Sequence, residues 1–235
     1  MLFDDDAGVR SCNRSAGGSD DSAKHDRGGP CARHYLTRPR SPPSRLLKFL
    51  LMTPVLQTTR LILRPLELAD AEQVQIIFPH WEIVRYLANR VPWPYPPDGA
   101  YKYYRDIALP AVAREEEWHW MLSLKSKPEQ IIGGVTLRRK ENENRGFWLG
   151  LPWQGRGLIT ETCEVVTDYW FDVLKFPLLR VAKAVPNVAS RRISENQGMR
   201  LVRHEEREYV SGRFMSEIWE ITAEEWRARK PRDEK

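Results

Sequence analysis

The sequence predicts an α/β fold in which a mixed sheet carries helices on its faces within one folded domain. Short segments with alternating apolar and polar residues, bounded by Gly, Pro and Ser, indicate strands. The segment after Gly157 places apolar residues at helical spacing and is the best-defined amphipathic helix of the chain. The segments follow one another as strand, helices, three strands, helix, strand, helix and two strands, which is the order expected of a sheet covered by helices.

Each element has its own signal. Residues 59–65 alternate, with Leu61 and Leu63 on one side, and end at a proline. Four prolines in residues 91–97 exclude a helix interior and a central strand there, and Gly198 suits the left-handed end of a helix. The expected elements are a strand at 59–65, short helices from 70 and at 81–88, a helix at 99–108 weakened near Pro110, strands at 118–125, 130–138 and 146–150, a helix at 157–173, a strand at 178–185, a helix at 187–196, and a hairpin formed by 199–210 and 213–221.

The two ends of the chain lack such patterns. Residues 1–51 are rich in Gly, Ser, Asp, Arg and Pro, so we expect a disordered N-terminal extension. Because patterned sequence begins directly after Met52, we interpret this extension as dispensable or as an upstream misreading of the start codon, which the intact mass of the native protein would decide. The folded domain is expected at 52–225, followed by a charged tail at 226–235.

The distribution of charge argues against a nucleic-acid partner. The formal net charge is +5, but residues 1–50 hold nine Lys and Arg against six Asp, which leaves +2 for the rest of the chain. Nucleic-acid-binding domains concentrate basic residues on one element, and the expected domain does not. We therefore expect no nucleic-acid partner for the folded part.

Cysteine and histidine usage indicates neither a disulfide framework nor a metal site. The chain has three cysteines and no spacing typical of metal ligands. His119 is interpreted as a strand histidine, and Cys163 as a residue of a helix surface or the core. The apolar segment 46–52 is too short for a membrane span. We therefore expect a cytoplasmic protein without a metal and without membrane contact.

The loop of residues 154–157 joins an expected strand to the amphipathic helix. Gly155 and Gly157 allow the backbone to approach an anion without a Cβ in the way. The first N–H groups of the helix have no intrahelical acceptor and lie at its positive end, a place that attracts phosphate. The loop lacks the Rossmann and Walker patterns, so a plain tight turn is an equal alternative when the loop is taken alone.

The surroundings of this loop are similar to a known family. Residues 146–161, which read Gly-Phe-Trp-Leu-Gly-Leu-Pro-Trp-Gln-Gly-Arg-Gly-Leu-Ile-Thr-Glu, resemble motif A of the GNAT N-acetyltransferase superfamily, whose signature is Gln/Arg-x-x-Gly-x-Gly/Ala. Gln154 and Gly157 occupy the first and fourth positions. Ile159 departs at the sixth, where a small residue is usual.

Two further segments resemble the ribosomal-protein alanine acetyltransferase branch of that superfamily. They are the opening strand at 59–65 and the stretch that begins Asn187-Val188-Ala189-Ser190. Together the resemblance covers roughly residues 55–222. It implies the GNAT fold, a mixed, mostly antiparallel sheet of about seven strands with a splayed parallel pair, flanked by helices.

The resemblance also implies acetyl-CoA as co-substrate, bound where strands 147–150 and 179–185 splay apart, with direct transfer and no acyl-enzyme. Backbone groups of Trp148 and Leu149 would pair with the pantetheine. Asn187 would bond a pantetheine amide. The residues assigned to the pyrophosphate are Gln154, Gly155, Arg156, Gly157, Leu158, Ile159 and Thr160.

A protonated amine needs a base before it attacks a thioester. Glu143 is the candidate, although relatives often carry the acid at the position of Asn144, and one register step reverses the face of a strand; a solvated Glu is the alternative. Ser190 would donate to the departing thiolate, while both it and Asn187 are also favoured helix caps. Because the helix from residue 187 lacks the tyrosine acid that many relatives have, Tyr209 is a substitute.

The acceptor site is expected at the proline-rich loop, where Trp93 and Tyr95 would flank the substrate or merely pack on their own domain. The predicted function is transfer of acetyl to an amine, either a protein N-terminus or a small molecule such as an antibiotic. A non-catalytic acetyl-CoA-binding domain is the alternative, and a third interpretation, an interaction protein driven by its tail, predicts that deletion of residues 1–51 abolishes activity. A homodimer is left open.

Overall fold

The computed structural model describes residues 53–229, all within one compact unit of the chain. The expectations for residues 1–51 and for the last residues of the tail lie outside this range. The described strands form a five-stranded antiparallel sheet in the order β1-β2-β3-β4-β5 and a three-stranded antiparallel sheet in the order β6-β8-β7. The strands are β1 (Leu56–Gln57), β2 (Leu61–Pro65), β3 (Glu117–Leu124), β4 (Gly133–Arg138), β5 (Arg145–Leu149), β6 (Leu178–Ala184), β7 (Arg200–Tyr209) and β8 (Gly212–Thr222).

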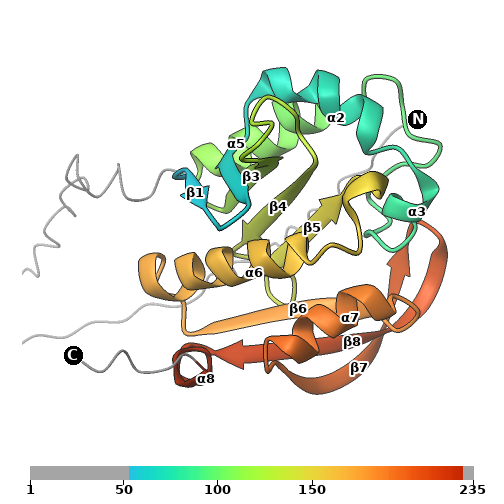
Figure 1. Cartoon of the computed structure of the whole chain (residues 1–235). Coiled ribbons are helices and arrows are strands. Elements are labelled where there is room, and N and C mark those ends of the chain that lie inside the picture. The colour runs from blue at the N-terminus through green and yellow to red at the C-terminus, as the bar shows by residue number, and fades with distance from the viewer. Residues whose placement is uncertain (1–52, 230–235) are drawn as a thin grey trace, which may run out of the picture. The chain divides into compact units, whose positions relative to one another are not determined.

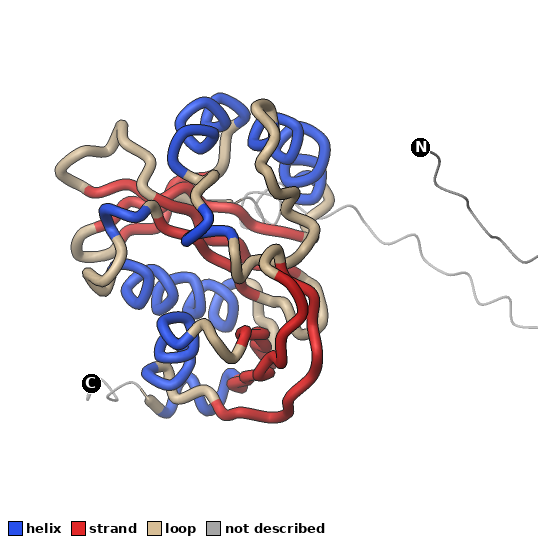
Figure 2. The backbone as a smooth tube through the Cα atoms, turned by 90° about the vertical axis from the view of Figure 1, so that its right-hand side faces the viewer, coloured by secondary structure: helices blue, strands red, loops and turns tan. Residues whose placement is uncertain are grey.

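Helices cover both faces of the larger sheet (Figure 1). Figure 2 shows the short helices above the strands and the longest helix below them. The helices of the upper face are α2 (Ala71–Ile77), α3 (Trp81–Val84), α4 (Gly99–Tyr103) and α5 (Leu109–Ala113), the helix below is α6 (Leu158–Asp168), and α7 (Val188–Asn196) and α8 (Ala223–Ala228) accompany the smaller sheet.

Strand β3 shows why the sheet is buried on both faces. Its alternate residues Trp118, Trp120 and Leu122 belong to the core cluster shared with α6 and the smaller sheet. Met121 belongs to the cluster shared with α2 and α4. Because successive strand residues point to opposite faces, His119 points toward the α2–α4 side with Met121.

The helix expected to weaken near Pro110 instead continues. α4 passes through a π turn, Tyr104–Ala108, directly into α5, which ends at Ala113. Pro110 lies in the first turn of α5, where its missing N–H costs little. The expected helix is thus one turn longer than its sequence suggested.

The folded region also extends past the boundary expected at residue 225. A capping box starts α8: the Thr222 hydroxyl accepts the Glu225 N–H at 3.2 Å, and the Glu225 carboxylate accepts the Thr222 N–H at 2.8 Å. Trp226 is 1% exposed, and its Nε1 donates to Asp168 at the end of α6 at 2.7 Å. This tryptophan is a core residue rather than part of a charged tail.

The expected single sheet of about seven strands is divided into two. β5 and β6 run in the same direction (Figure 1). At their start the Asn144 N–H donates to the Arg180 carbonyl at 2.8 Å, and the Arg180 N–H donates to Asn144 Oδ1 at 2.7 Å. Beyond this point the described strands share no ladder, so the predicted splayed parallel pair is the place where the two sheets part.

Candidate active site

The loop between β5 and α6 holds both of its glycines in left-handed backbone conformations. The φ angles are 73° at Gly155 and 74° at Gly157, values that an L side chain adopts only with strain. Gly157 precedes the first turn of α6, so the N–H groups of Leu158, Ile159 and Thr160 have no intrahelical acceptor. A Cβ built on Gly155 would meet no atom within 4 Å. Open N–H groups at the positive end of a helix are suited to an anion.

Arg60, directly before β2, fixes this loop. Its Nη1 donates to the Arg156 carbonyl at 2.9 Å and its Nε donates to Glu161 on α6 at 2.7 Å. The Gln154 side chain, which we assigned to the pyrophosphate, instead donates through Nε2 to the Leu149 carbonyl at 2.9 Å. The sequence contained no signal that would join Arg60 to a loop almost a hundred positions later.

The side chain of Ile159 packs against the core cluster that α6 shares with the larger sheet. A large apolar residue at this position therefore faces the interior. Its backbone N–H remains part of the loop.

The gap between β5 and β6 exposes one polar edge of β5. Backbone groups of successive strand residues point to opposite sides. The Gly150 N–H donates across to the β4 side, and the register pairs Trp148 with β4 in the same way. The backbone groups that face the gap are therefore those of Phe147 and Leu149, which corrects the assignment of Trp148. The side chain of Trp148 lines a cavity on the α2–α4 side instead.

A buried lysine on β6 lies at this gap. Lys183 is 6% exposed, and its Nζ lies 4.6 Å from the centroid of the Phe147 ring. Burial, with a smaller contribution from Arg145, lowers the pKa of Lys183 to about 7. Arg145 is buried as well, and it donates to Thr167 of α6 at 2.5 Å and to Gln197 at 2.7 Å. The interior beside the gap is thus electropositive.

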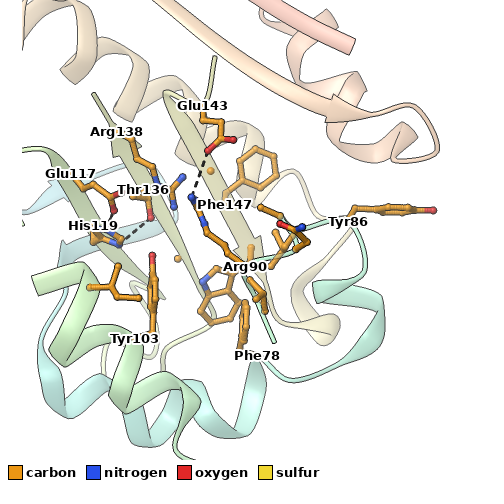
Figure 3. A pocket seen from close by; sticks show the side chains of 18 of the residues that line it. Phe78, Tyr86, Arg90, Tyr103, Glu117, His119, Thr136, Arg138, Glu143 and Phe147 are labelled. Carbon is orange, nitrogen blue, oxygen red and sulfur yellow. Dashed lines mark hydrogen bonds and ion pairs between the residues drawn. The ribbon is translucent and has the colours of Figure 1, made fainter. Parts of the chain in front are cut away.

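A cavity of about 810 Å³ opens beside β5 and is bounded by β3, β4, α4, the segment 86–95 and the end of β7. Its size is typical of a ligand site. Phe78, Tyr104, Met121 and Trp148 contribute apolar lining. Figure 3 shows the polar side chains pointing into it from several elements. Those labelled there are Arg90, Glu117, His119, Thr136, Arg138 and Glu143. The lining also includes the charged residues Lys140, Arg145, Arg207 and Glu208.

A family model described as an acetyltransferase (GNAT) domain matches residues 60–200, more than half of the chain. The chain belongs to the GNAT acetyltransferase family. A curated relative, "Putative ribosomal N-acetyltransferase YdaF" of Bacillus subtilis (strain 168), is 29% identical over 72 residues, which cover 29% of this chain and 39% of that protein. The match thus spans well under two thirds of that relative.

Solved structures agree on the GNAT fold. The ribosomal-protein-S5-alanine acetyltransferase of Vibrio fischeri has a TM-score of 0.62 at 15% identity, covering 75% of this chain and 99% of that one. RimL, a ribosomal L7/L12 alpha-N-protein acetyltransferase solved with coenzyme A, has a TM-score of 0.60 at 14% identity. The likeness covers 72% of this chain and 97% of RimL. The predicted fold is confirmed, and the names of these proteins agree with the predicted ribosomal-protein branch.

In this GNAT chain Glu143 lies at the cavity but is surrounded by cations. Its carboxylate is 2.8 Å from Lys140, 3.0 Å from Arg207 and 3.7 Å from Arg90, and Figure 3 shows the pair with Arg90. Burial opposes ionisation, yet these cations lower the pKa of Glu143 below its ordinary value. A carboxylate stabilised in this way is a weak base, which argues against Glu143 as the group that deprotonates the amine.

The candidates on α7 are not among the cavity-lining residues. The Asn187 side chain accepts the Ser190 N–H at 3.2 Å, which is the capping role that the sequence left open for this pair. Their proposed contacts with pantetheine and thiolate remain predictions.

Two aromatic candidates line the cavity and one does not. Tyr209 is buried, its hydroxyl is bonded to Ser216, and burial raises its pKa. Tyr95 packs edge-on against Phe78, with centroids 5.2 Å apart, and burial raises its pKa to about 12. Trp93 is 42% exposed, contacts Trp81 in a tilted arrangement with ring centroids 5.5 Å apart, and is not among the lining residues. Only the Tyr95 half of the predicted acceptor pair therefore reaches the cavity.

The polar side chains of β3 and β4 were not among the site residues predicted from the sequence. His119 is a strand residue, as interpreted, but it is bonded to Glu117 and Thr136 inside the cavity. The alternation Glu-x-His on one strand was a weak signal, and nothing indicated Thr136.

Within residues 53–229 no group of three His, Cys, Asp or Glu side chains could hold a metal ion. No helix of the same range has the length and apolar character needed to cross a membrane.

Proposed function

We propose that this chain binds acetyl-CoA along the gap between β5 and β6 and transfers its acetyl group directly to the α-amine of a protein N-terminus. The observation that carries the proposal is the loop of residues 155–160. Its two glycines have left-handed backbone conformations, and the N–H groups of the first turn of α6 have no intrahelical acceptor. The pyrophosphate would bind there. The edge of β5 at Phe147 and Leu149, with which no described strand pairs, would bind the pantetheine like an added strand. The Leu149 carbonyl there already accepts Gln154 Nε2, so the Leu149 N–H is the group available at that residue.

The cavity supports an acceptor that is not a polycation. Its lining holds five basic side chains against three acidic ones, so a polyamine or an aminoglycoside would meet charge of its own sign. The apolar lining suits the first side chain of a peptide. The names of YdaF and RimL, both ribosomal-protein acetyltransferases by name, favour the same acceptor class.

A thiol-release assay with a panel of amines tests the proposal. The panel contains hexapeptides with N-terminal Ala or Ser, the Ala peptide with a blocked N-terminus, spermidine and an aminoglycoside. We expect thiol release with the free peptides and none with the blocked one. Release only with the small amines would contradict the peptide acceptor, and cofactor binding by calorimetry without release on any acceptor would favour the non-catalytic alternative.

A small-molecule acceptor is the second candidate. It is favoured by the likeness to MccE, a microcin C7 self immunity acetyltransferase solved with acetyl-CoA and AMP, at a TM-score of 0.59 and 18% identity over 70% of this chain and 93% of that one. The same panel separates the two candidates. A peptide acceptor predicts thiol release with the free peptides, and a small-molecule acceptor predicts release with a small amine but with no peptide.

A further inference from the structure

The cavity contains a hydrogen-bond chain that links three side chains of β3 and β4. Glu117 Oε2 lies 2.6 Å from His119 Nε2, and Thr136 Oγ1 lies 3.1 Å from His119 Nδ1. The register places His119 directly opposite Thr136, so their side chains share a face of the sheet. Figure 3 shows all three, joined by dashed lines, at one end of the cavity.

Access to the imidazole runs through the threonine. His119 is 3% exposed and both of its ring nitrogens are bonded. Thr136 is half-buried and lines the cavity. Although His119 also borders the cavity, its ring is almost fully covered, so a ligand there would reach the Thr136 hydroxyl first.

The protonation states give each bond a direction. Burial would raise the pKa of Glu117, but the bond from His119 and the charge of Arg138 lower it, so the carboxylate is ionised and only accepts. His119 Nε2–H then donates to Glu117, and Nδ1 accepts the Thr136 hydroxyl. Burial and the charge of Arg138 lower the pKa of His119, while the bond to Glu117 opposes that lowering. The ring is therefore neutral, with a lone pair on Nδ1, and Glu117 is the group that favours its protonation.

The groups around the three hydrogen-bonded side chains come from β4, from the loop after α3 and from α4. Arg138 on β4 has its Nε 3.3 Å from Glu117 Oε1, and Arg90, from the loop after α3, adds a weaker field at Glu117. Tyr103 of α4 lies edge-on to the His119 ring, with centroids 6.4 Å apart. Glu117 is thus the anion that would stabilise a positive charge on the ring, while Arg138 disfavours that charge.

We propose that Thr136, His119 and Glu117 form a proton relay that deprotonates the α-ammonium group of the acceptor. This inference rests on the proposed function and replaces Glu143 as the base. The ammonium group donates one proton to Thr136 Oγ1 while the Thr136 proton moves to His119 Nδ1, and the imidazolium is paired with Glu117. Thr136 contacts the substrate, His119 holds the proton, and Glu117 positions and stabilises the ring.

The remaining steps balance without a further reagent. The neutral amine nitrogen forms a bond to the thioester carbonyl carbon, and the C–S bond breaks as the tetrahedral adduct collapses. The leaving thiolate takes the second amine proton and departs as free thiol. The proton on His119 returns through Thr136 to water after the amide leaves.

The relay is tested by the pH dependence of kcat/KM for Thr136→Val and Thr136→Ser with the N-terminal Ala hexapeptide. An α-amine has a pKa near 8, so only about 3% of it is neutral at about pH 6.5. Thr136→Val keeps the shape but removes the hydroxyl, and it should lower kcat/KM roughly 30- to 100-fold at about pH 6.5. The deficit should shrink to less than about fivefold at about pH 9.5, where the amine is already neutral. Thr136→Ser should retain most activity.

Glu117→Gln is a second, independent test of the relay, which remains informative if Thr136→Val fails to fold. It should show the same pH pattern, with thermal unfolding and coenzyme A affinity close to the wild-type values. A deficit that is equal at all pH values would indicate a structural role and overturn the relay. So would a Glu143→Gln variant that alone shows the pH-dependent loss. A wild-type chain that binds acetyl-CoA but acetylates no acceptor would overturn the proposed function and the relay together.

Discussion

Under the proposed function, cofactor binding depends most on the two glycines of the loop before α6. Replacing Gly157 with Val adds a side chain beside the N–H groups and strains a backbone φ of 74°. Coenzyme A binding, measured by calorimetric titration, should weaken by about 2 kcal/mol or more because two or three charged hydrogen bonds are at stake.

Gly212→Val is the matched control for that variant. Gly212 also has a positive φ, of 115°, and a Cβ there would meet nothing within 4 Å. It lies in the β7–β8 turn, so the control carries backbone strain without touching the loop. Equal affinities of the Gly157 variant and the wild type for coenzyme A would mean that the loop is only a turn.

Lys183 provides a prediction about stability rather than binding. Its pKa falls from 10.5 to about 7 on folding, so between those values the unfolded chain binds more protons than the folded one. Stability should therefore rise with pH through this window and be lowest, for this group, below pH 7. Lys183→Met should stabilise the protein without ligand by a few kcal/mol at neutral pH, given about 1.4 kcal/mol per pKa unit.

Urea unfolding between pH 7 and 10.5 checks this prediction. The free energy of unfolding of Lys183→Met should depend less on pH than that of the wild type. Parallel curves for the two proteins would show that the lysine reaches solvent in the folded state.

Among individual residues, those of the loop before α6 could be predicted from the sequence, whereas those of the proposed proton relay could not. Gly155 and Gly157 could be identified because they are neighbours with a local conformational reason. Glu117, His119 and Thr136 become one group only through the β3–β4 register, and a single-residue slip would move them to opposite faces. Glu143 could be located at the cavity, but its three cationic partners come from separate parts of the chain.

Among the elements, α8 supports the fold more than its charged sequence suggests. Trp226→Ala removes a side chain that is 1% exposed and should cost about 3–5 kcal/mol of stability in urea unfolding. Trp81→Ala is the control, since Trp81 is 39% exposed on α3 and should cost less than about 1 kcal/mol. Similar losses for both would mean that α8 is not docked on the core.

The long patterned elements were predictable because their periodicity is local. The alternation in β2 and the helical spacing in α6 both appear in the structure close to the expected positions. Pro110 was misleading, because a π turn before it gives it a first-turn position. The division of the sheet could not be read from periodicity, since it depends on where two strands stop pairing.

For the molecule as a whole, one core holds two sheets around α6. Leu63 of β2, Val181 of β6 and Ile221 of β8 belong to the same buried cluster as Val166 of α6. Helix α6 thereby packs against both sheets, although β5 and β6 do not pair with each other. Phe147 lies between the gap and the cavity, because the Lys183 ammonium lies over its ring and the side chain also lines the cavity.

The central claim is that a donor bound in the gap meets an α-amine in the cavity. The most direct measurement follows both products in one reaction of the full chain with acetyl-CoA and the N-terminal Ala hexapeptide. We predict equal amounts of free thiol and of peptide that has gained one acetyl group on its N-terminal nitrogen, as located by fragment masses. Thiol released without acetylated peptide, or no thiol although acetyl-CoA binds, would contradict it.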